Sequence, residues 1–206
     1  MPIKLNGATS GSVELGVPAT VSGGDVTLTL PPNDGSAGQV LSTNGAGALS
    51  FVNKVEWDQF QLTSDVTSDQ LITTWARSSY NGFGQFGGQM TVSSGIFTFP
   101  STGYYLIIVR ALFNILNSDT IIVTTNTTTN NSTYSQAGWA SDGGNNGSVH
   151  ARHASSSSFT FVDVTDTSNV KVRFNASSIT SGSKVVADSA SDKPYSNVTF
   201  IRLGDT

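Results

Sequence analysis

Side chains that could perform catalysis are few in this sequence, and their spacing argues against an active site. The only glutamates, Glu14 and Glu56, lie outside the predicted core of the larger C-terminal part. The aspartates that lie close together in sequence form two groups, Asp58, Asp65 and Asp69, and the pair Asp163 and Asp166. Aspartate in such Ser/Thr-rich segments usually caps turns. Because the sequence also has no cysteine, no G-x-S-x-G elbow and no Gly-rich phosphate loop, we predict a non-enzymatic protein without a cofactor.

The weak candidates for metal binding lie in the segment SDGGNNGS and in the strand predicted after it. Asp142, Asn145 and Asn146 offer oxygen ligands of the kind that bind Ca²⁺, but the segment lacks a bidentate Glu and has the composition of an ordinary turn. His150 and His153 are three residues apart, so a strand directs them to opposite faces. A single chain cannot place both on one metal ion, although a threefold axis would collect copies of one histidine. We expect no metal site.

Aromatic residues beside amides in predicted loops are the candidates for surface binding. Flat apolar rings next to amide groups suit contact with carbohydrate or with another protein. The candidate surface-binding residues are Tyr80, Asn81, Phe83, Tyr134 and Trp139. The alternative is that Phe83 and Phe86 pack beneath their own loop.

The composition predicts an all-β fold. Ser, Thr, Asn and Gly make up nearly half of the chain, whereas charged residues contribute only 12%. Ser, Asn and Gly disfavour helices, while Thr, Val, Ile and aromatic residues fit a pleated sheet. No long stretch shows the 3.6-residue periodicity of a helix. We therefore expect strands and turns throughout.

Charge and targeting signals exclude several classes of partner. A net charge of -4, with ten basic residues and no basic cluster, cannot supply the surface that binds nucleic acid. The N-terminus MPIKLNGATSGS lacks the apolar stretch of a secretory signal, and the absence of cysteine fits a reducing cytoplasm. We expect a protein made in the cytoplasm, with no nucleic-acid partner and no membrane insertion.

The first part of the chain, residues 1–53, contains an imperfect repeat of short alternating strands. GSVELGVPA is echoed by GDVTLTLPP, and each segment begins at Gly and ends at Pro. Short strands over about fifty residues cannot form a sizeable core of their own. The part is therefore either a loose extension or a segment that intertwines with other copies in a shared prism. The spacing of the apolar residues favours the second interpretation.

The second part, residues 54–206, has the pattern of a β-sandwich. Short β-runs alternate with clusters of Gly, Ser and Asn at the spacing typical of that architecture. The predicted strands are 55–62, 70–77, 83–86, 90–93, 95–99, 103–114, 119–125, 133–139, 148–153, 158–164, 169–175, 184–187 and 196–203.

The predicted strand at 103–114 is apolar on both faces. Alternate residues of a strand point to opposite sides. One side carries Tyr105, Ile107, Val109, Ala111 and Phe113, and the other carries Tyr104, Leu106, Ile108, Arg110 and Leu112. We assign the first set to the sandwich core. The second set, which contains the charge, then needs another dry partner.

The order of segments in the second part resembles the C1q/TNF-like jelly roll. The resemblance rests on Trp75-Ala76-Arg77, on the Gly-rich loop at 80–86, on Gly95-Ile96-Phe97-Thr98-Phe99-Pro100, on Thr102-Gly103-Tyr104-Tyr105, on Asp166 to Val172 and on Asn197 to Gly204. It covers about 130 residues and implies a jelly-roll sandwich that forms trimers. The loops at 124–136 and 141–148 depart from the family pattern, so no ligand site in them is carried over.

The resemblance implies a threefold interface for the second side of the strand. Tyr104, Leu106, Ile108, Arg110 and Leu112 are its predicted residues. Burying three or four such side chains contributes about 1.5–3 kcal/mol each. The alternative is a monomeric sandwich in which a loop covers the strand.

The segment Asp34 to Phe51, DGSAGQVLSTNGAGALSF, is similar to segments in structural and fibre proteins of tailed bacteriophages. Joined to a C1q/TNF-like knob, it implies a virion component. In this interpretation residues 1–53 dock to other virion proteins, and the knob at 54–206 contacts a glycan or protein on the host surface.

We therefore expect a non-enzymatic, homotrimeric fibre, spike or knob of a phage virion. One alternative is a trimeric decoration protein that stabilises the phage head, and co-sedimentation with DNA-filled heads would favour it over a tail fibre. A second alternative is a secreted bacterial C1q-like lectin, which glycan binding without association to virions would favour.

Overall fold

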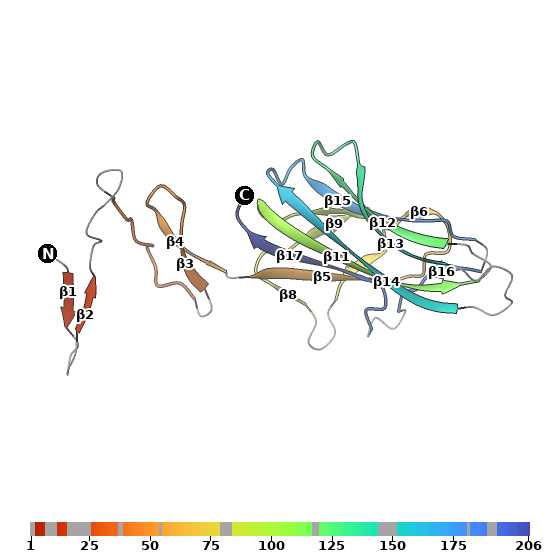
Figure 1. The fold of residues 1–206 in the computed structure, drawn as a ribbon, viewed down its shortest axis with the longest axis horizontal. Coiled ribbons are helices and arrows are strands. Elements are labelled where there is room, and N and C mark those ends of the chain that lie inside the picture. The colour runs from red at the N-terminus through yellow and green to blue at the C-terminus, as the bar shows by residue number, and fades with distance from the viewer. Residues whose placement is uncertain are drawn as a thin grey trace. The chain divides into compact units, whose positions relative to one another are not determined.

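The computed structural model describes residues 3–6, 12–15, 26–36, 39–53, 55–78, 84–116, 120–143, 152–180, 182–188 and 193–206. Every regular element within these ranges is a β-strand, which confirms the prediction of an all-β fold (Figure 1). No helix long and apolar enough to cross a membrane occurs in this part of the chain. The chain divides into two compact units, residues 1–54 and 55–206.

The N-terminal unit consists of two short hairpins and one bridging segment. The first hairpin pairs β1 (Ile3–Asn6) with β2 (Ser12–Leu15), and the second pairs β3 (Gln39–Thr43) with β4 (Leu49–Asn53). The carboxamide oxygen of Asn44 closes the second turn by accepting the backbone N–H groups of Ala46 and Ala48. Two of the expected strands lie only partly within the described residues. The segment GSVELGVPA contributes only β2 to the described structure, and GDVTLTLPP contributes one parallel bridge between Thr29 and Ala48.

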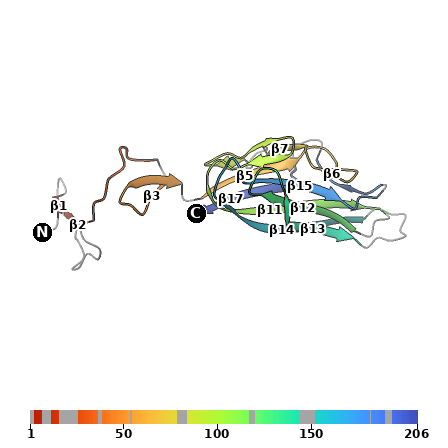
Figure 2. The same cartoon turned by 90° about the horizontal axis from the view of Figure 1, so that it is seen from above.

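The C-terminal unit is a sandwich of two antiparallel sheets. The β11 sheet contains β14 (Arg152–Val164), β11 (Gly103–Ile115), β17 (Asn197–Gly204), β5 (Glu56–Leu62) and β7 (Trp75–Arg77) in that order, with β16 (Lys184–Val185) beside β11 and β8 (Gln85–Phe86) beside β5. The β12 sheet contains β13 (Ser135–Gly143), β12 (Thr120–Thr128), β15 (Lys171–Ser177), β10 (Ile96–Thr98) and β9 (Thr91–Ser93), with β6 (Gln70–Leu71) beside β15. Figure 2 shows β11, β17 and β5 running alongside one another.

One strand is longer than the sequence predicted. We expected a break at residues 154–157, where Ala-Ser-Ser-Ser has the composition of a turn. Instead β14 continues through these residues, because it pairs with β11 without interruption from Gly103 opposite Val164 to Ile115 opposite Arg152. The backbone hydrogen bonds of a long neighbour override the weak β-propensity of serine. Conversely, the strand expected at 70–77 is divided into β6 and β7.

The core lies between the two sheets and is rich in aromatic rings. Phe97 of β10 is fully buried, and its ring centroid lies 5.1 Å from the rings of both Phe60 and Phe200. Phe174 and Trp75 complete the cluster at 5.6 and 6.1 Å from Phe97. The five predicted core residues of β11 are all buried here, which confirms their assignment: Tyr105, Ile107, Val109, Ala111 and Phe113.

An ion pair with a buried carboxylate links β5 to β7 and, through Met90, to the segment that precedes β9 of the other sheet. The Asp58 side chain is 1% exposed, and Arg77 donates to its two carboxylate oxygens at 2.9 and 2.8 Å. The backbone N–H of Met90 also donates to Asp58, and Arg77 donates to the carbonyl of Met90. These hydrogen bonds raise the pKa of Arg77 above its ordinary value. β5 and β7 belong to one sheet, and Met90 precedes β9 of the other sheet. The hydrogen bonds of this cluster therefore fix the distance between the two sheets at this point.

Removing the central ring should strongly destabilise the fold. We expect Phe97→Ala to lower the free energy of unfolding by about 3–5 kcal/mol, because it deletes a large, fully buried side chain and leaves a cavity. Urea unfolding of the full chain at a fixed concentration measures this loss. Tyr195→Ala, at a partly exposed position, is the control and should lose much less. Equal losses for the two variants would show that Phe97 is not central to the core.

Breaking the buried ion pair should cost more than breaking an exposed one. We expect Asp58→Ala to destabilise by about 1–3 kcal/mol, because it leaves the buried Met90 N–H without its acceptor and removes both carboxylate acceptors of Arg77. Lys184→Ala removes a half-exposed pair with Asp65 and should cost about 0–1 kcal/mol. Thermal or urea unfolding of both variants compares the two pairs. A loss for Asp58→Ala no larger than that for Lys184→Ala would contradict this role.

Candidate interaction surface

The outward side of the β11 sheet is apolar in its middle. On β11 the outward residues Leu106 and Ile108 are half-buried, while Tyr104 is exposed. The register with β14 places Phe161 opposite Leu106 and Phe159 opposite Ile108. These two phenylalanines are 72% and 64% exposed. Exposed aromatic rings on both paired strands, β11 and β14, therefore begin a continuous patch on the outward side of the sheet.

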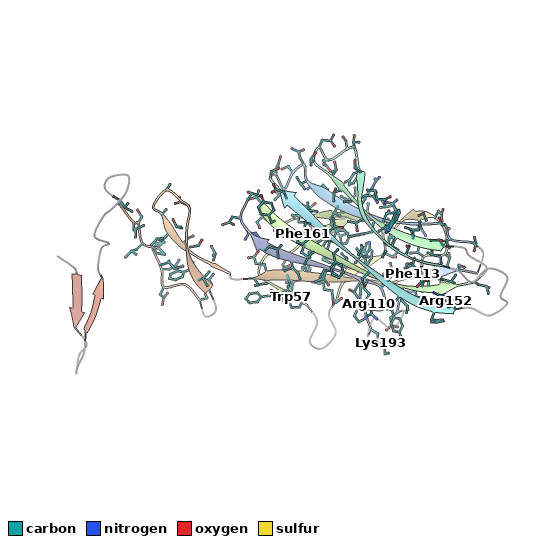
Figure 3. All side chains as sticks on the ribbon, viewed as in Figure 1. Trp57, Arg110, Phe113, Arg152, Phe161 and Lys193 are labelled. Carbon is teal, nitrogen blue, oxygen red and sulfur yellow. The ribbon has the colours of Figure 1, made fainter. Side chains whose placement is uncertain are left out.

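The patch crosses the whole sheet as one row of side chains. The paired residues from β14 to β8 are Phe161, Leu106, Ile201, Trp57 and Phe86. We call these five residues the aromatic row. Neighbouring strands lie about 4.8 Å apart, so such a row places an apolar side chain at every strand without a gap. Figure 3 shows Phe161 on β14 and Trp57 on β5, near the two ends of the row.

The adjacent row changes from apolar to polar across the sheet. Phe159 and Ile108 continue the apolar surface, but Thr199 and Gln59 follow them on β17 and β5. The Gln59 amide donates to the Thr199 hydroxyl at 3.0 Å. This hydrogen bond links the two polar side chains to each other, so the polar end of the row is locally ordered.

The predicted interface residues occupy two different environments. Tyr104, Leu106 and Ile108 lie in or next to the aromatic row. Arg110 instead pairs with Ser157 on one side and Asn197 on the other, and Leu112 lies opposite Ser155. The apolar part of the outward side therefore ends between Ile108 and Arg110.

A groove adjoins this surface at the edge where β13 and β14 meet. It has a volume of about 550 Å³ and is lined by Gln136, Ala137, Gly138, Trp139, Ser157, Ser158 and Phe159. Trp139, a predicted surface-binding residue, is 60% exposed here. Phe159 belongs both to the groove and to the outward side of the sheet. The groove and the outward face therefore form one connected surface.

Gly138 allows the two edge strands to approach closely beneath the groove. A Cβ atom added at this position would lie 2.5 Å from the Thr160 hydroxyl oxygen. The hydroxyls of Thr125, Ser158 and Thr160 are buried, and none of them has a hydrogen-bond partner among the described residues. Buried hydroxyls without partners stabilise a fold less than satisfied ones. This edge is therefore packed less favourably than the aromatic core.

Tyr134, another predicted surface-binding residue, lies against Arg173 rather than projecting into solvent. The Arg173 guanidinium carbon is 4.0 Å from the centre of the Tyr134 ring, a distance typical of a cation–π contact. Burial raises the pKa of Tyr134, although the nearby Arg173 cation opposes the shift. The other predicted surface-binding residues, Tyr80, Asn81 and Phe83, lie outside the described residues. Phe86 is 49% exposed.

The weak metal candidates are only partly described. Asp142 forms an ion pair with Arg152 across β13 and β14, so its carboxylate already has a cationic partner. Asn145, Asn146 and His150 lie outside the described residues. His153 lies on β14 opposite Asn114. Among the described residues, no three His, Cys, Asp or Glu side chains form a group that could hold a metal ion.

Four residues of the patch were not predicted from the sequence: Phe159, Phe161, Trp57 and Ile201. The signal was present in Phe159-Thr160-Phe161-Val162, where aromatic residues alternate with residues of the core side. Like β11, this short segment carries apolar residues on both the core side and the outward side. Pairing in register is what joins the two strands into one surface.

Comparison with known proteins supports the fold. No model of a known protein family and no curated protein sequence matches the chain. Among solved structures, murine APRIL at pH 5.0 is similar with a TM-score of 0.55 and 11% identity, over 73% of this chain and 100% of that chain. Eiger TNF from S. frugiperda is similar with a TM-score of 0.57 and 13% identity, over 75% of this chain and 96% of that chain. The chain therefore contains a jelly-roll sandwich of the TNF-like fold.

Proposed function

We propose that the protein is a non-enzymatic structural protein that assembles into a homotrimer through the outward side of the β11 sheet. The aromatic row carries this proposal. Isolated apolar residues are normal on a surface, but a contiguous patch across five strands is typical of an interaction site. Covering it removes the exposed rings of Phe161 and Phe86 from water, at up to about 1.5–3 kcal/mol each, and completes the burial of the half-buried members of the row.

The shape of the surface favours a contact between unlike parts of two copies. The aromatic row is a sheet face, whereas Trp139 and Phe159 border a groove at the sheet edge. A face-to-face pair related by a twofold axis would cover the row and leave Trp139 exposed. A contact of the edge of one copy with the face of the next covers both surfaces, and it forms a closed ring when the rotation between neighbouring copies closes. The resemblance to C1q/TNF-like domains supports three copies in that ring.

The proposed biological setting is the virion of a tailed bacteriophage. Its support is the similarity of Asp34 to Phe51 to segments of phage structural proteins. In this proposal residues 1–53 dock to other virion proteins. The knob displays its loops for attachment to a glycan or protein of the host surface, as a fibre or spike would.

A capsid decoration trimer is the second proposal, because the same self-associating surface would serve to clamp head subunits. A secreted bacterial lectin is the third. Fractionation of virions with an antibody against the chain distinguishes them. Signal in purified tails supports the fibre, signal in DNA-filled heads supports the decoration protein, and absence from virions contradicts both.

A charge placed in the patch should prevent assembly. We expect Ile108→Asp to convert the wild-type mass, three times 21.5 kDa, to that of a monomer or to cause aggregation, because the carboxylate would be buried at the contact. Static light scattering after gel filtration measures the mass. Ser93→Asp adds the same charge at an exposed position of β9, in the other sheet and outside both the aromatic row and the groove, and is the matched control.

The two variants separate an interface effect from a general effect of charge. Assembly that is lost in Ile108→Asp and retained in Ser93→Asp supports the proposed surface. A monomeric wild type, or full assembly of the Ile108→Asp chain, contradicts it.

A further inference from the structure

Residues 26–36 and 39–52 of the N-terminal unit have a defined fold without a buried core. None of these residues is buried. Local hydrogen bonds nevertheless fix its loops: Asn33 accepts the N–H of Gly35, and Gln39 accepts the N–H of Ser36. Gly35 lies flat against the Phe51 ring, where an added Cβ would be 2.7 Å from the ring. Residues 26–36 and 39–52 are therefore held by turns and hairpin pairing, not by burial of apolar side chains.

The apolar side chains of this unit face solvent along one segment. Val26, Leu28 and Leu30 are 59–72% exposed. Thr29 pairs in parallel with Ala48 through hydrogen bonds to Gly47 and from Leu49, which indicates a local strand conformation. In that conformation Leu28 and Leu30, which flank Thr29, share one side. We call Val26, Leu28 and Leu30 the aliphatic stripe.

The chemistry of the unit favours an identical aliphatic surface as the partner of the stripe. Between residues 26 and 53 the sequence has a single charged residue, Asp34. A partner that binds through ion pairs would therefore have only one charged side chain to contact. An uncharged stripe of Val and Leu is complementary to another copy of itself, since both surfaces gain by leaving water.

Chain connectivity supplies such copies at high local concentration. Only residues 54 and 55 separate β4, which ends at Asn53, from β5, which begins at Glu56. Two extended residues span at most about 7 Å. If the C-terminal units assemble as proposed, each N-terminal unit is tethered to that assembly by a very short connection. Short tethers give effective concentrations in the millimolar range.

We infer that the aliphatic stripes of the assembled chains pack against one another and form the apolar core that each N-terminal unit lacks. This inference rests on the proposed homotrimer and names the partner of residues 26–53 as the same residues of the other copies. It also gives the imperfect repeat a physical role, because a strand that is apolar on one side and coreless by itself acquires a core only in the assembly.

Cysteine cross-linking tests this inference, because the natural chain has no cysteine. In the full chain, Leu30→Cys places one thiol on the stripe, and Thr27→Cys places one at an exposed position of the same segment, outside the stripe. A disulfide needs Cβ atoms about 3.5–4.5 Å apart. We expect mild oxidation of dilute protein to give covalent pairs for Leu30→Cys and few for Thr27→Cys. In a trimer only two of every three stripe thiols can pair, so one thiol per assembly stays titratable.

Light scattering on the same samples keeps the two proposals distinguishable. An assembled protein whose Leu30→Cys and Thr27→Cys variants cross-link equally, or not at all, overturns the packing of the stripes and leaves the assembly of the C-terminal units intact. A monomeric protein overturns both. Adding Ile108→Asp to Leu30→Cys should abolish the cross-link, because the tether then no longer gathers the stripes. Persistence of the cross-link in a monomeric double variant would also contradict the inference.

Discussion

The structure depends on a strand that is apolar on both sides. The inward residues of β11 contact the aromatic cluster around Phe97, and the outward residues continue into the aromatic row. A single sandwich can cover only the inward side. The packing that stabilises one copy therefore leaves an apolar surface that a second copy can cover, and the fold and the proposed assembly have the same physical origin.

Because the chain carries few charges, covering the aromatic row with a second copy has a small desolvation penalty. Burying unpaired charges is strongly unfavourable, whereas hydroxyls and apolar groups carry smaller penalties. The aromatic row contains no charged residue, and Arg110 lies beyond its boundary among Ser157 and Asn197. The buried pair of Asp58 and Arg77 is satisfied internally. The aromatic row can therefore be dehydrated without removing a charge from water, whereas the exposed charges of Asp163, opposite Tyr104, and Arg110 lie beside the row on the same side of the sheet.

Sequence patterns predicted the parts of the fold that depend on local alternation, and they failed where pairing between distant strands decides. The two sides of β11 were predicted correctly because alternation alone separates them. The continuous β14 was missed because its Ser-rich middle is a strand only through pairing with β11. The aromatic row was missed for a related reason: Trp57, Ile201 and Phe161 become neighbours only through the register of the sheet. Tyr134 was predicted as a binding residue, but its stacking on Arg173 depends on tertiary structure.

The most direct test of the central claim is the solvent accessibility of Phe161 in the wild-type protein. Hydroxyl-radical footprinting read by mass spectrometry measures this for each residue, with Tyr195, which belongs to neither the aromatic row nor the groove lining, as an internal reference. The account predicts that Phe161 and Trp57 are protected at concentrations where the chain assembles and become reactive on dilution, while Tyr195 is unchanged. In the single chain the Phe161 ring is 72% exposed. If Phe161 reacts at every concentration as strongly as such an exposed ring, the result contradicts the account.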